Sequence, residues 1–184
     1  QGHPNRTDLP GVETCSGPLG SGLSQAIGMA LAERLDNPQT KKYFYCLLGD
    51  GELNEGQVWE AMMLAGKQKI GNLICFVDRN NIQIDGFTED IMPLEPLADK
   101  WNAFNFDVQV INGNSIEDIY NAIEKAKATF NKPSVIICKT IPGRGVPEFE
   151  HDFHWHGKAP NKEEAETALN RLRNLGGKIE SHHN

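Results

Sequence analysis

Short apolar runs separated by longer segments of helical spacing recur along this 184-residue chain. Several of the runs are apolar along their whole length, which is typical of strands in a parallel sheet that is covered on both faces. The segments expected to form strands are residues 43–48, 72–77, 107–111 and 134–140. The alternation of strands with helices predicts an α/β fold, a doubly wound and mostly parallel sheet with helices on both faces. No internal repeat or domain boundary is evident, so residues 1–184 are predicted to form a single domain.

The segments between these runs predict helices. Those with helical spacing are residues 19–35, 56–68, 93–104 and 115–129. A start resembling a capping box at Ser115 supports the last of these four. A further helix is expected to begin at Asn161 and to end at Gly176 and Gly177. The two longest segments expected to be loops are residues 1–18 and 141–160.

The charge and hydropathy of the chain argue against two classes of partner. The formal net charge is −7, whereas a general nucleic-acid surface needs an excess of Lys and Arg. No apolar stretch approaches the roughly 20 residues of a membrane span. We therefore expect neither nucleic acid nor a membrane as a partner. An anionic small ligand remains compatible with this charge, because one bound metal ion can reverse the local field.

The four cysteines indicate the compartment. None belongs to a C-x-x-C pair, and Cys46, Cys75 and Cys138 lie inside apolar runs. This usage is typical of buried, reduced thiols, and no signal peptide is visible, so a cytoplasmic location is expected. The chain starts at Gln1 in a polar stretch without a Met, which predicts a processed or N-terminally truncated chain.

A Gly-Asp-Gly turn follows the first expected strand, within the stretch LLGDGELNEG. Asp50 stands in this turn, and Asn80 follows the next strand thirty residues later, a spacing of about one βαβ unit. In an open parallel sheet, ligands bind beyond the carboxyl ends of the strands, so both side chains are expected on one rim. A carboxylate, an amide oxygen and a backbone carbonyl suit Mg²⁺ when ligand phosphates supply the missing oxygens.

Glycines around this rim are suited to phosphate binding. Gly49 and Gly51 allow a tight turn and a close approach of the backbone to a phosphate. The stretch CSGPLGSGL leads into a helix and offers free N–H groups at its N-terminus. These features suggest a metal-bridged diphosphate, but GDG alone also suits a hairpin or an ordinary strand-to-helix turn, and spacing leaves both open. An EF-hand is excluded, because Glu55 and Ala61 stand where its Gly and its last acid are required.

Several motifs, taken in order, resemble one enzyme family. The stretch GDGELNEGQVWEAMMLAGKQKIGNLICFVDRNNIQIDG is similar to the thiamine-diphosphate motif, which begins with GDG and ends in Asn. GHP at residues 2–4, PGVETCSGPLGSGLSQAIGMALAE, the IDG after the Asn, and WHGKAP at residues 155–160 resemble transketolase in particular. The similarity covers about residues 2–175. E1 subunits of the pyruvate dehydrogenase type share GDG and the Asn but resemble the chain less elsewhere, and deoxyxylulose-phosphate synthase is also more remote.

The resemblance implies a thiamine-diphosphate-binding fold and a set of ligands. Mg²⁺, or another divalent cation such as Ca²⁺ or Mn²⁺, would be bound by the side chains of Asp50 and Asn80 and by the carbonyl of Ile82. Asn81 stands where the family commonly has Gly, which predicts a tighter loop beside Asn80. The residues implied to contact thiamine diphosphate are Gly17, Pro18, Leu19, Gly49, Asp50, Gly51, Glu52, Asn80, Ile82 and His156.

Three residues, one of them also an implied cofactor contact, are implied to act in catalysis. His3 matches the family histidine that contacts the hydroxyls of the donor sugar, and His156 matches the histidine near the diphosphate and the reacting centre. Both would supply proton-transfer groups. Glu55 matches an acid of the carboxylate network that links the two active sites of a dimer. His151, His154 and His156 also form an H-x-x-H-x-H pattern, for which a zinc site is the alternative.

The implied activity is the transfer of a two-carbon ketol unit from a ketose phosphate to an aldose phosphate. The chain would be the N-terminal subunit of a split transketolase, and a C-terminal subunit would carry the pyrimidine-binding domain, in a homodimer or heterotetramer. The isolated chain is expected to be inactive. Two alternatives stay open: a related thiamine-diphosphate transferase acting on another donor, such as a modified sugar, or a subunit fragment that binds no cofactor.

Overall fold

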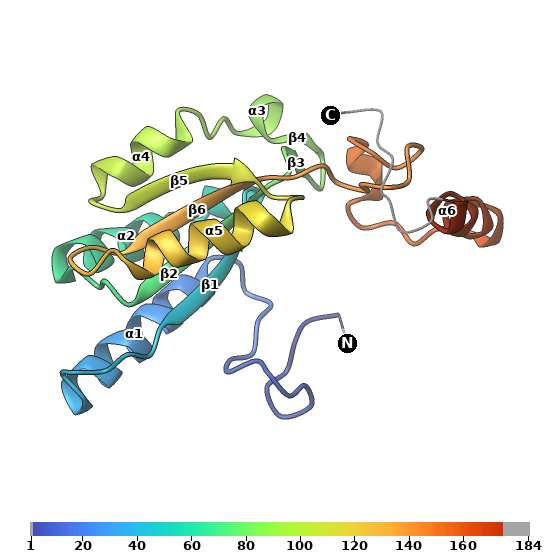
Figure 1. Ribbon diagram of the computed structural model, residues 1–184. Coiled ribbons are helices and arrows are strands. Elements are labelled where there is room, and N and C mark those ends of the chain that lie inside the picture. Colours follow the sequence, from blue (N-terminus) through green and yellow to red (C-terminus); the bar gives the residue numbers. More distant parts are fainter. Residues whose placement is uncertain (1, 175–184) are drawn as a thin grey trace.

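The computed structural model describes residues 2–174 and confirms the predicted α/β class. Four parallel strands form the central sheet in the order β1-β2-β6-β5 (Figure 1). The strands are β1 (Phe44–Gly49), β2 (Leu73–Arg79), β5 (Asp107–Asn112) and β6 (Ser134–Lys139). Each matches a predicted strand to within two residues at either end. Continuous apolar runs therefore identified the buried strands correctly.

Crossovers in opposite directions place helices on both faces of the sheet. The chain steps from β1 to β2 through α2 (Gly56–Gln68), and then passes over the position of β6 to reach β5 through α4 (Leu97–Ala103). It returns to β6 through α5 (Ile116–Lys127). Because crossovers between parallel strands are right-handed, this reversal puts α5 on the face opposite α2 and α4. Figure 1 shows the resulting layers, with α1 (Ser21–Asp36) beside β1.

The two faces of the sheet carry hydrophobic cores of unequal size. The larger core joins the sheet to α1, α2 and α4. The smaller core lies under α5, where Ala122 and Ala126 meet Ile136. This helix does not cover β1, so Tyr45 and Leu47 remain 50% and 75% exposed on that face.

The predicted burial of three thiols is confirmed. Cys46, Cys75 and Cys138 are buried and free, whereas Cys15 is exposed. The buried thiols lie in β1, β2 and β6, the three strands whose sequences are mostly apolar.

The last helix, α6 (Lys162–Asn174), begins where the sequence predicted, with a reciprocal cap. Asn161 Oδ1 accepts a hydrogen bond from the N–H of Glu164 at 2.9 Å, and Glu164 Oε2 accepts from the N–H of Asn161 at 2.7 Å. The predicted end of this helix at Gly176 and Gly177 lies outside the described residues. Within residues 2–174, no helix is both long and apolar enough to cross a bilayer.

Between β2 and β5 the structure differs from the prediction. The helix expected from residue 93 begins only at Leu97, since the residue before a proline is disfavoured in the helical conformation and Pro96 stands just before the helix. The same stretch also forms a small antiparallel hairpin, β3 (Ile82–Gln83) and β4 (Gly86–Phe87), and a short helix, α3 (Thr88–Ile91). Two short helical turns lie elsewhere: η1 (Gly51–Asn54) follows β1, and η2 (Phe153–Trp155) lies in the predicted loop 141–160.

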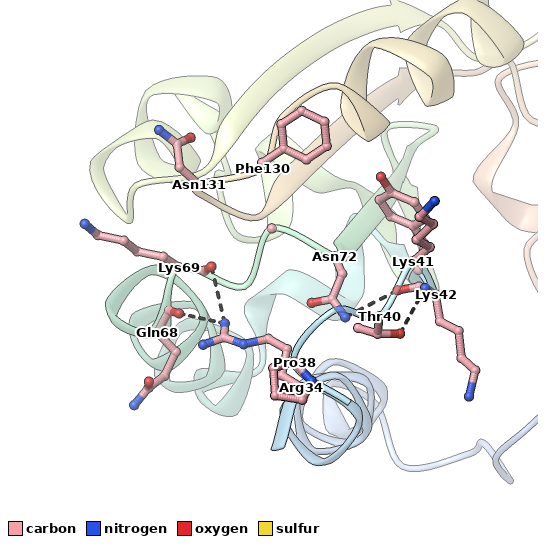
Figure 2. A pocket seen from close by; sticks show the side chains of 12 residues that line it. Arg34, Pro38, Thr40, Lys41, Lys42, Gln68, Lys69, Asn72, Phe130 and Asn131 are labelled. Atoms are coloured by element: carbon pink, nitrogen blue, oxygen red, sulfur yellow. Dashed lines mark hydrogen bonds between the residues drawn. The ribbon is translucent and has the colours of Figure 1, made fainter. Parts of the chain in front are cut away.

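At the amino ends of β1, β2 and β6, a polar hollow lies opposite the predicted rim (Figure 2). Arg34 of α1 reaches across it, and its Nη1 donates to the carbonyl oxygens of Gln68 at 2.9 Å and Lys69 at 3.4 Å. These carbonyls end α2, where a cation is stabilised by the negative end of the helix dipole. Asn72 Nδ2 donates to the carbonyl of Lys42. The hollow therefore lies between the ends of α1 and α2 and the segment that precedes β1, and none of the predicted site residues lines it.

Candidate functional site

Asp50 lies directly after β1, and its side chain is almost completely buried, with 1% exposed. Its Oδ2 accepts hydrogen bonds from the N–H of Asn81 at 2.7 Å and from Arg79 Nη1 at 2.9 Å. Its Oδ1 accepts from the N–H of the adjacent Gly51 at 2.8 Å. Burial raises the pKa of Asp50 above its ordinary value, and the hydrogen bonds from Arg79 and from the backbone oppose that rise.

Asn80 stands one residue beyond the end of β2, in a turn that contacts Asp50. Its Oδ1 accepts from the N–H of Ile82 at 3.0 Å, and its Nδ2 donates to Asp78 Oδ2 at 3.1 Å. Asp78 Oδ1 in turn accepts from Thr140 Oγ1. Because a carboxylate can only accept, Asp78 selects the NH₂ end of the Asn80 amide and turns its oxygen the other way.

The backbone at residue 81 makes this turn possible. Asn81 has φ +66°, in the left-handed region, where Asn is tolerated better than most residues other than Gly. Its N–H donates to Asp50 Oδ2, and its carbonyl accepts from Thr88. Asp50 and Asn80 are thus held by one turn at the carboxyl rim, as the spacing predicted, and Ile82 follows as the first residue of β3.

The glycine-rich turn before α1 reaches the same rim. Gly20 caps α1 with φ +81°, and its N–H donates to Glu52 Oε1 at 2.6 Å. The other oxygen of Glu52 accepts from the N–H of Gly49 at 3.0 Å. One carboxylate therefore joins the turn before α1 to the end of β1. The carbonyl of Leu19 accepts from Gln57 Nε2 at 2.7 Å, which connects the start of α1 to the start of α2.

The three predicted catalytic residues lie at different distances from this turn. His3 packs over Gly17, where an added Cβ would lie 3.5 Å from the ring Cγ of His3. Glu55 is exposed at the N-cap of α2, and its Cβ lies beside Gly20. His156 is exposed at the end of η2, and its N–H donates to the carbonyl of Phe153. The structure thus brings His3 and Glu55 to the glycine-rich turn and holds His156 on a separate segment.

That separate segment lies beyond the carboxyl ends of the strands (Figure 1). Phe153 contacts Phe87 of β4 with ring centroids 5.7 Å apart, which attaches η2 to the hairpin. His154 Nδ1 pairs with Asp152 at 2.6 Å. Across residues 2–174, no three or more His, Cys, Asp or Glu side chains are placed to hold a metal ion, so the zinc alternative gains no support.

The prediction missed Arg79, Asp78 and Thr88. Asp78 and Arg79 end a buried strand, and two charged residues at such a position signal buried partners. Arg79 is 3% exposed and Thr88 is fully buried. Their partners lie on separate segments that only the fold brings together, so the sequence pointed to the residues without identifying what they contact.

The donors at the rim suit a divalent cation and a diphosphate. Asp50 offers a carboxylate from the end of β1, and Asn80 and Ile82 offer an amide and a carbonyl oxygen from the segment after β2 that bonds to Asp50. Such hard oxygen ligands suit Mg²⁺. The helices α1 and α2 both begin beside this turn, and neither has a side-chain hydrogen bond at its cap. The N–H of Ser21 donates to the carbonyl of Pro18 and that of Val58 to the carbonyl of Glu55, and the other N–H groups at these helix starts suit an anion.

Comparison with known proteins identifies the family. Residues 1–178 match the family described as transketolase, thiamine diphosphate binding domain. The chain is 44% identical over 167 residues to 6-deoxy-6-sulfo-D-fructose transketolase subunit SqwG of Clostridium sp. (strain MSTE9), covering 90% of this chain and 60% of that protein. It is 39% identical over 183 residues to one subunit of the apulose-4-phosphate transketolase of Phocaeicola vulgatus, covering 100% of this chain and 64% of that protein.

A solved structure agrees with these relatives. The transketolase of Campylobacter jejuni superposes with a TM-score of 0.83 at 38% identity, covering 94% of this chain and 28% of that one. The chain therefore spans less than two thirds of the length of the relatives described here. It belongs to the transketolase family and matches its thiamine-diphosphate-binding domain.

Proposed function

We propose that this chain is the Mg²⁺- and diphosphate-binding part of a transketolase assembled from separate subunits. It would take part in moving a two-carbon ketol unit from a ketose phosphate to an aldose phosphate. The single observation that supports this most is the turn that joins Asp50 to Asn80, through the hydrogen bond from the N–H of Asn81 to Asp50 Oδ2. Two relatives that are themselves named as subunits of transketolases support the assembly.

In this proposal, Asp50 and Asn80 bind the cation by their side chains and Ile82 by its carbonyl. Thiamine diphosphate, when bound, supplies the carbon nucleophile that takes up the two-carbon unit. The chain's own part is to bind and orient the diphosphate. The backbone from Gly17 to Leu19 and from Gly49 to Gly51 would lie against the cofactor, and Glu52 would keep these two turns together.

Proton transfer and the contact between subunits are assigned to three other residues. His3, packed on Gly17, would hold and move protons at the hydroxyls of the donor sugar. His156 would act at the phosphate side once its segment lies over the cofactor. Glu55 would join the carboxylate network between two active sites in a homodimer or heterotetramer.

A magnesium-dependent titration of thiamine diphosphate tests the site. Asp50→Asn and Asn80→Ala should each weaken Mg²⁺ binding by about 100-fold or more, since loss of a direct ligand costs at least as much as loss of an outer partner. Asp99→Asn, at an exposed position on α4, serves as the matched control and should bind as the parent does. Equal affinities across all four proteins, measured by calorimetry with melting curves to confirm folding, would overturn the metal assignment.

The partner and the donor need a second assay. The chain should show no ketol transfer alone and should gain it with a subunit that carries the pyrimidine-binding domain. The names of two relatives point to a sulfonated ketose and to apulose 4-phosphate, which favours a modified sugar as a second candidate donor. Initial rates with a panel of ordinary and modified ketoses separate the two donors. Robust transfer by the isolated chain would overturn the split assembly.

A further inference from the structure

Arg79 occupies a position unusual for an arginine, at the end of a buried strand with 4% of its side chain exposed. Its two terminal nitrogens point to different neighbours. Nη1 donates to Asp50 Oδ2 at 2.9 Å and to Thr88 Oγ1 at 2.6 Å. Nη2 donates to Glu89 Oε1 at 2.6 Å and to Glu95 Oε1 at 3.2 Å. The guanidinium thus connects a buried carboxylate to two partly exposed ones.

The outer partners are themselves fixed. Glu89 Oε1 also accepts from the N–H of Leu94 at 3.0 Å, and Glu95 Oε2 accepts from the N–H of Leu97 at 2.8 Å. These bonds hold the segment from α3 to the start of α4 against the guanidinium. Because the planar guanidinium donates in fixed directions, anchoring its outer side also determines the direction of its bond to Asp50.

The charges in this group are balanced in a way that suits a neighbouring cation. A lone guanidinium beside a metal-binding carboxylate would repel a divalent ion. Here Glu89 and Glu95 offset the charge of Arg79 on its outer side, so Asp50 keeps its attraction for a cation. Burial alone would raise the pKa of Glu89, but hydrogen bonds from the N–H of Leu94 and from Arg79 lower it below its ordinary value, which favours the ionised form.

Arg79 also helps to determine which oxygen of Asp50 remains available. Oδ2 is occupied by Arg79 and by the N–H of Asn81, whereas Oδ1 accepts only from the adjacent Gly51 within the described part of the chain. We propose that Arg79 is a positioning residue that, together with the N–H of Asn81, restricts Asp50 to one-oxygen ligation and thereby favours Mg²⁺ over Ca²⁺. Mg²⁺ demands near-ideal octahedral geometry, whereas Ca²⁺ accepts two-oxygen carboxylates and higher coordination. This inference rests on the proposed function of the same site.

The test compares Mg²⁺ and Ca²⁺ affinities by calorimetry, with saturating thiamine diphosphate and the chain paired with its pyrimidine-binding subunit. Arg79→Met should lower Mg²⁺ affinity by about 10- to 100-fold. It should lower Ca²⁺ affinity less, because Oδ2 then keeps only the bond from the N–H of Asn81 and one of its two lone pairs can turn to the larger ion. Arg79→Lys keeps the positive charge but lacks the planar guanidinium with its fixed donor directions. Its ratio of Mg²⁺ to Ca²⁺ affinity should lie between those of the parent and Arg79→Met. Arg171→Met removes an exposed arginine paired with Glu148 and is the matched control.

Glu95→Gln keeps the test decisive if Arg79→Met does not fold. Glu95 has 59% of its side chain exposed, so the substitution should leave folding intact while loosening the outer anchor of Arg79. The expected result is a several-fold fall in the ratio of Mg²⁺ to Ca²⁺ affinity, a ratio that general loss of stability would not shift. An unchanged ratio of Mg²⁺ to Ca²⁺ affinity in Glu95→Gln and Arg79→Lys overturns this inference but leaves the proposed function standing. Failure of the parent complex to bind either cation overturns the proposed function and this inference with it.

Discussion

At the carboxyl rim, the two adjacent residues Asp78 and Arg79 orient different side chains of the candidate site. Asp78 and Arg79 are neighbours on β2, and successive side chains on a strand point to opposite faces of the sheet. Arg79 therefore reaches Asp50, whereas Asp78 reaches Thr140 of the segment after β6 and Asn80 of the turn. The side chains of the candidate metal ligands Asp50 and Asn80 are thus each oriented by one of two adjacent residues.

Asp78→Asn tests this orientation at the residue scale. An amide can both donate and accept, so the substituted side chain no longer selects the NH₂ end of Asn80. Mg²⁺ affinity in the presence of thiamine diphosphate should fall about 10-fold, which is typical for loss of an outer-shell partner. Thr140→Val removes one donor to Asp78 but leaves its carboxylate facing Asn80, and should cost less. Calorimetry that ranks Thr140→Val as equal to or worse than Asp78→Asn would contradict this.

At the scale of elements, close packing of α2 depends on one glycine. Gly66 lies inside this helix and is buried, and an added Cβ would clash with the carbonyl oxygen of Phe104. Gly66→Ala should therefore destabilise the fold by about 1–3 kcal/mol, the usual cost of overpacking, despite the better helix propensity of Ala.

Gly28→Ala is the matched control for this prediction. Gly28 lies in α1, and its added Cβ would meet nothing within 4 Å. Replacing it should stabilise the helix by up to about 1 kcal/mol. Denaturant unfolding of the two variants and the parent measures both changes. The same sign of change in both variants would show that propensity, and not the contact with Phe104, determines the outcome.

Elements with a strong local signal were predictable, and those determined by tertiary contacts were not. β1, β2 and β6 followed from their apolar runs, and the start of α6 followed from the helix-start signal at Asn161. β3 and β4 have two residues each, too few for periodicity to identify a strand. The rim position of Asp50 and Asn80 followed from spacing alone. The group around Arg79 did not, because no spacing pattern links Arg79 to its partners, which only the fold brings to the guanidinium.

At the scale of the whole molecule, three buried thiols make folding sensitive to alkaline pH. Burial raises the pKa of Cys46 from the ordinary 9.0 to about 12 and that of Cys138 to about 11, and Glu52 and Asp78 add to these rises. Burial raises the pKa of Cys75 well above its ordinary value. The folded state therefore keeps protons that the unfolded state loses, and the free energy of unfolding should fall as pH rises from 9 toward 11–12.

Cys138→Ala isolates one of these contributions. A single thiol protonated only in the folded state contributes a loss of about 1 kcal/mol between pH 9 and 10. The free energy of unfolding of Cys138→Ala should therefore decline less over that interval, by about this amount, whatever its absolute stability. Cys15→Ser, at an exposed position, should follow the parent curve. Parallel curves for the parent and Cys138→Ala, from denaturant unfolding at each pH, would mean that the Cys138 thiol titrates alike in both states.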